Sequence, residues 1–284
     1  MVKLRRLTLG AWYYATLPYR RWNKGGGAPV TILFYHRVAD SFPNAWTISN
    51  RRFSQHIEWL ERRFDLISLE EAQRRIRSGD SPRPAVALTF DDGYAENCDY
   101  ALPLLIRKKI PCTYFVASMF VREGWPFPHD VAAGQPLPVN TPQQLRELAD
   151  AGIEIGAHTR SHADLGRVTD PRVLHDEVVR SRDELAEMIG HPVRYFAFPY
   201  GMHRNLNAAA FSLAKDAGYL GVCSAYGGYN VVGGDAFHLH RFHGDPDLLR
   251  LKNWTTVDPR KVYTVMPFHY RRLGERLLVG GNAL

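Results

Sequence analysis

The stretch Ala85-Val86-Ala87-Leu88-Thr89-Phe90-Asp91-Asp92-Gly93 joins an apolar run to two adjacent carboxylates and a glycine. The run predicts a buried strand, and Asp91 and Asp92 fall where this strand ends and the backbone turns. Neighbouring side chains point in different directions, so one carboxylate can bind a metal while the other handles a proton. Asp and Gly are also ordinary turn residues, so an acidic turn that caps the next helix accounts for the same stretch.

Strand-like and helix-like segments alternate along the chain from Pro29 onward. Apolar runs predict strands over residues 31–36, 85–90, 112–117, 153–157, 194–198, 220–224 and 237–242. Amphipathic periodicity and capping signals predict helices over residues 51–65, 69–78, 141–152, 170–190 and 207–217. An alternation repeated about seven times requires crossover connections, so we expect an α/β fold whose mostly parallel sheet closes into a barrel inside a layer of helices.

Two histidines follow the predicted strand 153–157. The strand runs directly into His158, and His162 comes four residues later. This spacing places both imidazoles on one side of the turn if the turn is helical, which suits two ligands of one metal, although the spacing also arises by chance. The position matters more than the spacing, because the chemistry of a parallel barrel gathers at the carboxyl ends of its strands.

Two further strand ends carry polar groups. Strand 194–198 is followed by Pro199-Tyr200-Gly201, a rigid turn that can aim the Tyr200 N–H into the same mouth, and strand 237–242 is followed by His243. With the carboxylate pair and the histidine pair, four polar clusters then meet on one rim. One Asp and two His form a three-ligand metal site that leaves positions open for water and substrate, as catalytic sites do.

Three motifs occur along the chain in an order that is typical of one protein family. They are Thr89-Phe90-Asp91-Asp92-Gly93, His158-Thr159-x-x-His162 and Phe196-Ala197-Phe198-Pro199-Tyr200-Gly201. In this order the chain resembles the polysaccharide deacetylases, carbohydrate esterase family 4, with the NodB homology domain, and specifically a subgroup with a Phe-Ala-Phe-Pro-Tyr-Gly third motif. The resemblance covers about residues 29–262. It implies a distorted (β/α)7 barrel that removes N-acetyl groups from the amino sugars of an N-acetylated poly- or oligosaccharide.

The resemblance also implies a role for each motif residue. Asp91 is expected to be the general base, and Asp92, His158 and His162 are expected to bind one divalent metal ion. Zinc is the favoured metal, with cobalt, nickel, iron and manganese as alternatives. The backbone N–H of Tyr200 is expected to stabilise the oxyanion, while a histidine protonates the departing amine.

One departure from the family pattern concerns the partner of the base. Many relatives have an arginine at the position of Ala197, where it pairs with the catalytic aspartate. Arg241, near the end of the last predicted strand, is the candidate replacement that would keep Asp91 ionised.

The choice of the general acid is the other open point. His238, His240 and His243 compete, and alternation along a strand places His238 and His240 on one face and His243 on the other. We expect the acid to be His243, because it follows the carboxyl end of the strand. His36, at the end of the first strand, is a further rim residue for which a structural hydrogen-bonding role is an equal alternative.

The positive charge is concentrated at the start of the chain. The formal net charge is +7, and residues 1–25 supply +6 of it through six basic residues with no acidic one, which leaves +1 for the rest. A nucleic-acid-binding body is therefore not expected. The six basic residues are Lys3, Arg5, Arg6, Arg20, Arg21 and Lys24.

Three regions are expected along the chain: a basic and aromatic extension over 1–28, the barrel over 29–262 and a tail over 263–284. The extension resembles a weak signal peptide, but no A-x-A-like cleavage site follows it. Its aromatic and basic residues suit a bilayer interface, so residues 1–27 are expected to make peripheral membrane contact, with packing on the barrel as the alternative. A cytoplasmic location, or one at the inner membrane face, is favoured over secretion.

Two other functions stay open beside N-deacetylation. A related amidase or deformylase would use the same metal and base on a small or lipid-linked substrate. A non-catalytic glycan-binding barrel is the second alternative, against which the retention of Asp91 with a complete ligand set argues. Motifs of serine esterases, zincins and P-loop proteins do not occur in the sequence.

Overall fold

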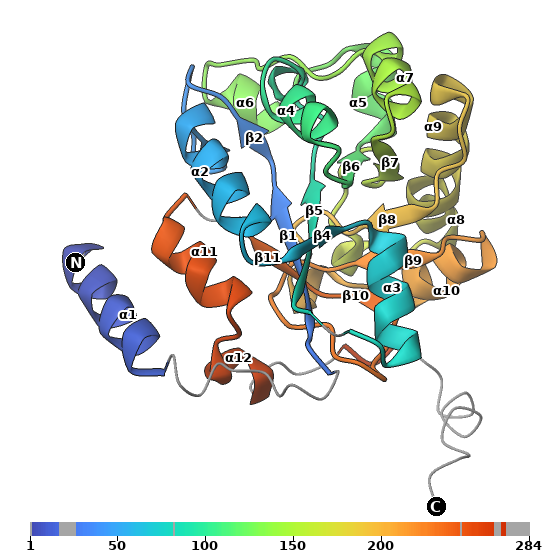
Figure 1. Cartoon of the computed structure of the whole chain (residues 1–284). Helices are drawn as coiled ribbons and strands as arrows, with labels where there is room; N and C mark the ends of the chain where they lie inside the picture. The colour runs from blue at the N-terminus through green and yellow to red at the C-terminus, as the bar shows by residue number, and fades with distance from the viewer. Residues whose placement is uncertain (1, 17–26, 82, 245, 264–267, 271–284) are drawn as a thin grey trace, which may run out of the picture.

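The centre of the protein is a parallel β-sheet that curves into a barrel (Figure 1). The computed structural model describes residues 2–16, 27–81, 83–244, 246–263 and 268–270. Neighbouring strands, in order, are β1 (Val30–Tyr35), β5 (Ala85–Phe90), β6 (Cys112–Val116), β7 (Glu154–Ala157), β8 (Tyr195–Ala197), β9 (Gly221–Cys223) and β10 (His238–Leu239). Strand β11 (Arg241–His243) pairs with β1, while β10 pairs with β9. The run 238–243 thus joins the two edges of the sheet, and the predicted distorted (β/α)7 barrel is confirmed.

Some strands and one helix differ from the sequence prediction. The single strand expected over 237–242 is interrupted at His240. The helix expected over 51–65 is α2 (Asn50–Glu61), which ends early because β4 (Asp65–Ile67) begins and pairs with the first half of β5. Strand β6 pairs with the second half of β5, on the same side as β4. A short ladder of β2 (Arg37–Val38) and β3 (Thr47–Ile48) follows β1.

Helices surround the barrel (Figure 1). They are α3 (Leu69–Ser78), α4 (Ala101–Lys108), α5 (Ser118–Glu123), α6 (Pro128–Ala132), α7 (Pro142–Asp150), α8 (Pro171–His175), α9 (Ser181–Ile189), α10 (Ala208–Asp216), α11 (Leu248–Thr255) and α12 (Pro259–Tyr263). The capping box predicted from Thr141 and Gln144 is present at the start of α7. The long helix predicted over 170–190 is α8 and α9 joined by one π-helical turn, Asp176–Arg180.

Alternate residues of the strands build two separate apolar layers. In β5, Val86 and Leu88 belong to the large core cluster between the sheet and the helices, whereas Ala85 and Ala87 belong to a smaller cluster that includes residues of α3. The side-chain period of two along a strand explains this division. Gln73 of α3 donates to the carbonyls of Leu220 and Ala236 at 2.7 and 2.6 Å. Helix α3 therefore closes the amino end of the barrel and leaves the carboxyl end open.

The described part of the N-terminal extension is a helix, α1 (Val2–Thr16), which lies beside α11 (Figure 1). Tyr13 is buried, and the Trp12 indole donates to Asp258 at 3.2 Å. This part of the extension packs on the body of the molecule, while its residues 17–26 lie outside the described part. Over the described residues, no helix combines the length and the apolar character that crossing a bilayer requires. Of the expected tail, Tyr270 stacks on Phe211 of α10.

Candidate active site

The two carboxylates after β5 diverge because the backbone turns sharply between them. The Asp91 N–H donates to the Tyr35 carbonyl at 2.8 Å, which extends the pairing of β5 with β1. Asp92 then takes a left-handed backbone conformation with a φ of 76°. Both carboxylates are buried. Asp91 continues the alternation of β5 into the barrel, and Asp92 faces the loop after β7.

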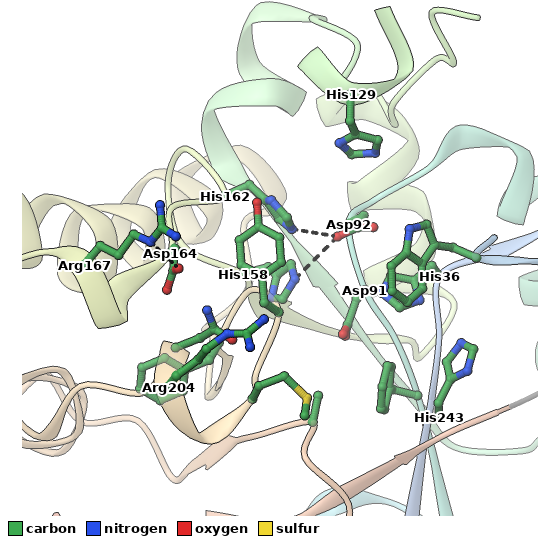
Figure 2. Close-up of a pocket in the computed structure, with 17 residues that line it drawn as sticks. His36, Asp91, Asp92, His129, His158, His162, Asp164, Arg167, Arg204 and His243 are labelled. Atoms are coloured by element: carbon green, nitrogen blue, oxygen red, sulfur yellow. Dashed lines mark ion pairs between the residues drawn. The ribbon is translucent and has the colours of Figure 1, made fainter. Parts of the chain in front are cut away.

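Asp92, His158 and His162 bring three ligand atoms together. The Nε2 atoms of His158 and His162 lie 3.5 and 3.2 Å from Asp92 Oδ1, and the three atoms all lie within 4.8 Å of one another. Figure 2 shows both imidazoles directed at the Asp92 carboxylate. Two imidazoles and one carboxylate are a donor set that suits zinc and several other divalent transition metals.

The hydrogen bonds around this cluster fit a divalent cation. Asp92 Oδ1 is buried and accepts no hydrogen bond from the described residues. His158 Nδ1 lies 2.8 Å from the Ala197 carbonyl, which can only accept, so Nδ1 is protonated and Nε2 is the nitrogen that carries the lone pair in the neutral ring. A buried carboxylate oxygen that faces an imidazole lone pair is unfavourable unless a cation lies between them. The three residues are therefore a group that could hold a divalent metal ion.

The two histidines are held by an irregular loop and not by a helical turn. Thr159 and His162 both have left-handed backbone conformations, with φ values of 59° and 58°. A helical turn would need right-handed values throughout. The sequence prediction required a helical turn between His158 and His162, and this turn is not helical. The two imidazoles are brought together by the left-handed residues of the loop instead.

Asp91 is paired with a buried arginine. Arg241 Nη1 and Nη2 donate to the two oxygens of Asp91 at 2.6 and 2.9 Å, and Arg241 is fully buried. Its Nε donates to the Ser224 carbonyl at 3.0 Å, which fixes the plane of the guanidinium. Burial alone would raise the pKa of Asp91, but the charge and hydrogen bonds of Arg241 hold this pKa below its ordinary value. Asp91 is therefore a carboxylate that stays ionised.

The three late histidines occupy different places. His243 lines the same pocket as Asp91, together with His36 and Phe34. His238 is buried elsewhere, with Nε2 2.9 Å from the Ser224 hydroxyl, and its ring lies 4.4 Å from that of His240. Neither His238 nor His240 lines the pocket. His238 and His240 thus lie on one side of the run 238–243 and His243 on the other, as the alternation along a strand predicts.

Tyr200 lies in the turn after β8. Its φ is 60°, and its ring packs edge-on against His162 at 5.3 Å. The Tyr200 N–H donates to no other group among the described residues, while the next amide, Gly201 N–H, donates to Pro199. The Tyr200 N–H is thus a donor at the rim of the site with no partner among the described residues.

A pocket of about 810 Å³ is lined by Asp91, by Tyr200 and His243, and by the three residues of the ligand cluster. Trp46, from the loop between β2 and β3, forms one wall with its ring 4.9 Å from that of His36 and 6.0 Å from that of His243. The rings of Phe127 and His162 pack edge-on, with their centroids 5.3 Å apart. Segment 121–140 therefore contributes to the rim through Phe127 and His129.

The family follows from the sequence match. Residues 78–222, which contain all three motifs, match the polysaccharide deacetylase family. The chain belongs to this family. The described geometry brings the motifs of the deacetylase family to one pocket, as the resemblance implies.

Three proteins illustrate the relationship. YxkH of Bacillus subtilis (strain 168) is 25% identical over 224 residues, which cover 78% of this chain and 73% of that protein. The chitooligosaccharide deacetylase of Bradyrhizobium sp. (strain ANU 289) is 29% identical over 133 residues, which cover 46% of this chain and about half, 52%, of that enzyme. The structure of IcaB from Ammonifex degensii superposes with a TM-score of 0.66 at 26% identity, over 82% of this chain and 99% of that one.

One residue that holds the deacetylase site is not apparent from the sequence. Glu177, on the π-helical turn, accepts hydrogen bonds from the backbone N–H groups of Arg160 and Ser161, each at 2.9 Å, and from the Ser161 hydroxyl at 2.6 Å. Glu177 is buried, and π-helical turns often occur at functional sites. The carboxylate thus fixes the loop between the two histidine ligands. The sequence signal is weak, because the buried face of this helical segment also carries Ser181 and Glu184.

Glu177→Gln is expected to lower the affinity for Zn²⁺ about tenfold. The amide keeps the volume of the side chain but cannot accept all three hydrogen bonds, so the ligand loop loosens. Calorimetric titration of the metal-free protein with Zn²⁺ measures this effect. Glu187→Gln, an exposed neighbour on α9, is the matched control. Equal zinc affinities for the two variants would contradict the role of Glu177.

Arg241→Met is expected to destabilise the fold by about 3–5 kcal/mol, because it leaves the Asp91 carboxylate buried without its partner. The depressed pKa of Asp91 contributes stability above its unfolded pKa, and this contribution is lost as the pH falls through the folded pKa. In the variant, burial acts alone and raises the pKa of Asp91, so the acid limb of the pH–rate profile moves to higher pH. Denaturant melts and a pH–rate profile measure both effects. An unmoved acid limb in a folded variant would show that Asp91 does not need Arg241.

Proposed function

We propose that the protein is a metal-dependent hydrolase that removes N-acetyl groups from amino sugars of a poly- or oligosaccharide. The proposal rests on one observation, which is that the Asp92, His158 and His162 cluster shares a pocket with the arginine-paired Asp91. Membership of the deacetylase family and the likeness to a chitooligosaccharide deacetylase support this class of substrate.

The chain supplies the groups that amide hydrolysis needs. Asp92, His158 and His162 would hold a divalent cation, which when bound would supply Lewis-acid polarisation of the amide carbonyl and lower the pKa of a water. Asp91, kept ionised by Arg241, accepts a proton from the attacking water. His243 donates a proton to the amide nitrogen as the C–N bond breaks, because an amine leaves poorly unless it is protonated. The Tyr200 N–H donates to the oxygen that gains charge.

Acetate release from a chitin oligosaccharide, with metal content measured on the same sample, tests the proposal. We expect acetate release to be abolished by a chelator and restored by Zn²⁺, with Co²⁺, Ni²⁺, Fe²⁺ and Mn²⁺ assayed beside it. Hydrolysis of small amides or formamides without acetate release from the oligosaccharide would favour the amidase or deformylase instead. Oligosaccharide binding without any hydrolysis would favour a glycan-binding barrel.

We also propose that the extension makes peripheral contact with the inner membrane face. Leu7 and Tyr14 of α1 are 71% and 68% exposed, on a helix within a segment of formal charge +6. Apolar and aromatic side chains together with basic residues favour the interface of an anionic bilayer. Leu7→Gln combined with Tyr14→Gln is expected to reduce sedimentation with anionic vesicles about tenfold or more, with acetate release unchanged. Leu220→Gln, an exposed leucine on the barrel, is the control, and equal sedimentation of all forms would count against this contact.

A further inference from the structure

The pocket has a cationic wall that the proposed chemistry does not use. Arg167 and Arg204 line the pocket, and Figure 2 shows them across the ligand histidines from His36 and His243. One side of the pocket is therefore aromatic and the other carries guanidinium groups.

Two short 3₁₀ turns, Leu165–Arg167 and His203–Asn205, present these arginines. The turns pack so closely that a Cβ at Gly166 would lie 2.0 Å from the Arg204 carbonyl oxygen, so only glycine fits there. Asn207 Nδ2 adds hydrogen bonds of 3.0 Å to the carbonyls of Leu165 and Val168. The two arginine-bearing turns form one preorganised unit.

The charges of this wall do not cancel. Arg167 Nε lies 3.3 Å from Asp164 Oδ2, and Asp164 also lines the pocket. Arg204 has no carboxylate partner among the described residues. The wall thus has two cations against one anion. Asp91 does not change this balance, because Arg241 already neutralises it.

A buried amide lies beside the unpaired arginine. Asn205 lines the pocket and is 4% exposed, and its Oδ1 has no hydrogen-bond partner among the described residues. An unpartnered buried acceptor is costly unless a donor reaches it, so a ligand here would carry a hydroxyl or amide N–H beside its charged group. The amide offers both donors and an acceptor, while the guanidinium of Arg204 offers a planar fork that matches carboxylate and phosphate oxygens.

We propose that Arg204, with Arg167 and Asn205, forms a subsite for a carboxylate or phosphate group carried by the amino sugar or by the unit joined to it. This inference rests on the proposed function, since the acyl group then lies at the ligand cluster while the charged group lies on the arginine wall. A neutral chitin oligosaccharide leaves Arg204 without a partner. The favoured substrate class is therefore an anionic glycan or a glycosyl phosphate.

Calorimetry with three sugars tests the subsite on the full chain, with and without Zn²⁺. The probes are N-acetylglucosamine, N-acetylglucosamine 1-phosphate and N-acetylmuramic acid, which carries a carboxylate. At least one charged sugar is expected to bind about tenfold or more tightly than the neutral one, which corresponds to one charged hydrogen-bonding contact. The phosphate and carboxylate arms show which anion the subsite prefers.

Arg204→Gln is expected to remove this preference in both the metal-free and the metal-loaded protein. Arg107→Gln, an exposed arginine on α4 outside the pocket, is expected to keep it. Gly166→Ala retains both charges but separates the turns, so it is also expected to weaken the preference. The same preference in Arg204→Gln as in the original chain, or none in the original chain, would overturn the proposal.

The outcomes also separate this inference from the proposed function. Deacetylation of neutral oligosaccharides without any charge preference would leave the function standing and remove the subsite. Binding of a charged sugar through Arg204 without hydrolysis of any amide would leave the subsite standing and remove the function.

Discussion

Asp92→Ala and His158→Ala are each expected to lose bound metal and acetate release together, whereas Asp91→Asn keeps the metal and loses turnover. Each of the first two variants deletes one of the three ligand atoms that lie within 4.8 Å of one another. Asparagine at position 91 keeps the volume and part of the pairing with Arg241 but cannot take up a proton, which removes about 10²–10⁴-fold of rate. Elemental analysis and acetate release on the same preparations measure the two properties.

The pattern of losses distinguishes the two adjacent carboxylates. Asp99→Asn, an exposed carboxylate nearby in the chain, is the matched control and is expected to change neither property. Loss of metal in Asp91→Asn with retention in Asp92→Asn would exchange the two roles.

His243→Gln is expected to lower kcat about 10²–10⁴-fold with metal retained, because general acid catalysis typically contributes that much. His243 lines the pocket that contains Asp91. Burial lowers the pKa of His240 to about 4, so this imidazole is neutral near pH 7 and donates a proton poorly. Single His→Gln variants at 238, 240 and 243, assayed on one oligosaccharide, make the comparison.

Smaller effects are expected at the other two positions. His238 is hydrogen-bonded to Ser224 in the core, so His238→Gln is expected to act on stability more than on turnover. A loss of kcat confined to His240→Gln, with His243→Gln fully active, would show that the proton comes from His240. His243 would then not be the general acid.

The sequence predicts the barrel and the ligand cluster because both depend on local signals. Apolar runs mark the strands, and a parallel barrel gathers the residues that follow them, so Asp92, His158 and His162 can be expected together. The pairing of Arg241 with Asp91 follows from strand alternation and the same rule. The order of elements and the period of a strand place these residues together, while the resemblance to the deacetylases assigns Asp92 rather than Asp91 to the metal and points to Arg241 as the partner of Asp91.

Other features depend on tertiary contacts that local patterns do not encode. The early end of α2 reflects the pairing of β4 with β5, which competes with the helical continuation. The loop from His158 to His162 is shaped by Glu177, which comes from a different element. The cationic wall arises where two turns distant in sequence meet at Gly166.

The seam formed by residues 238–243 determines when during folding the pocket becomes competent. Arg241 and Asp91 are 150 residues apart in sequence, so this pairing closes a long loop and is expected to form late. A chain folded only as far as β9 already has Asp92, His158 and His162, but Asp91 lacks its cationic partner and His243 is not in place. Metal binding is therefore expected to need only the elements up to β9, whereas turnover in the proposed reaction is expected to need the last strand as well.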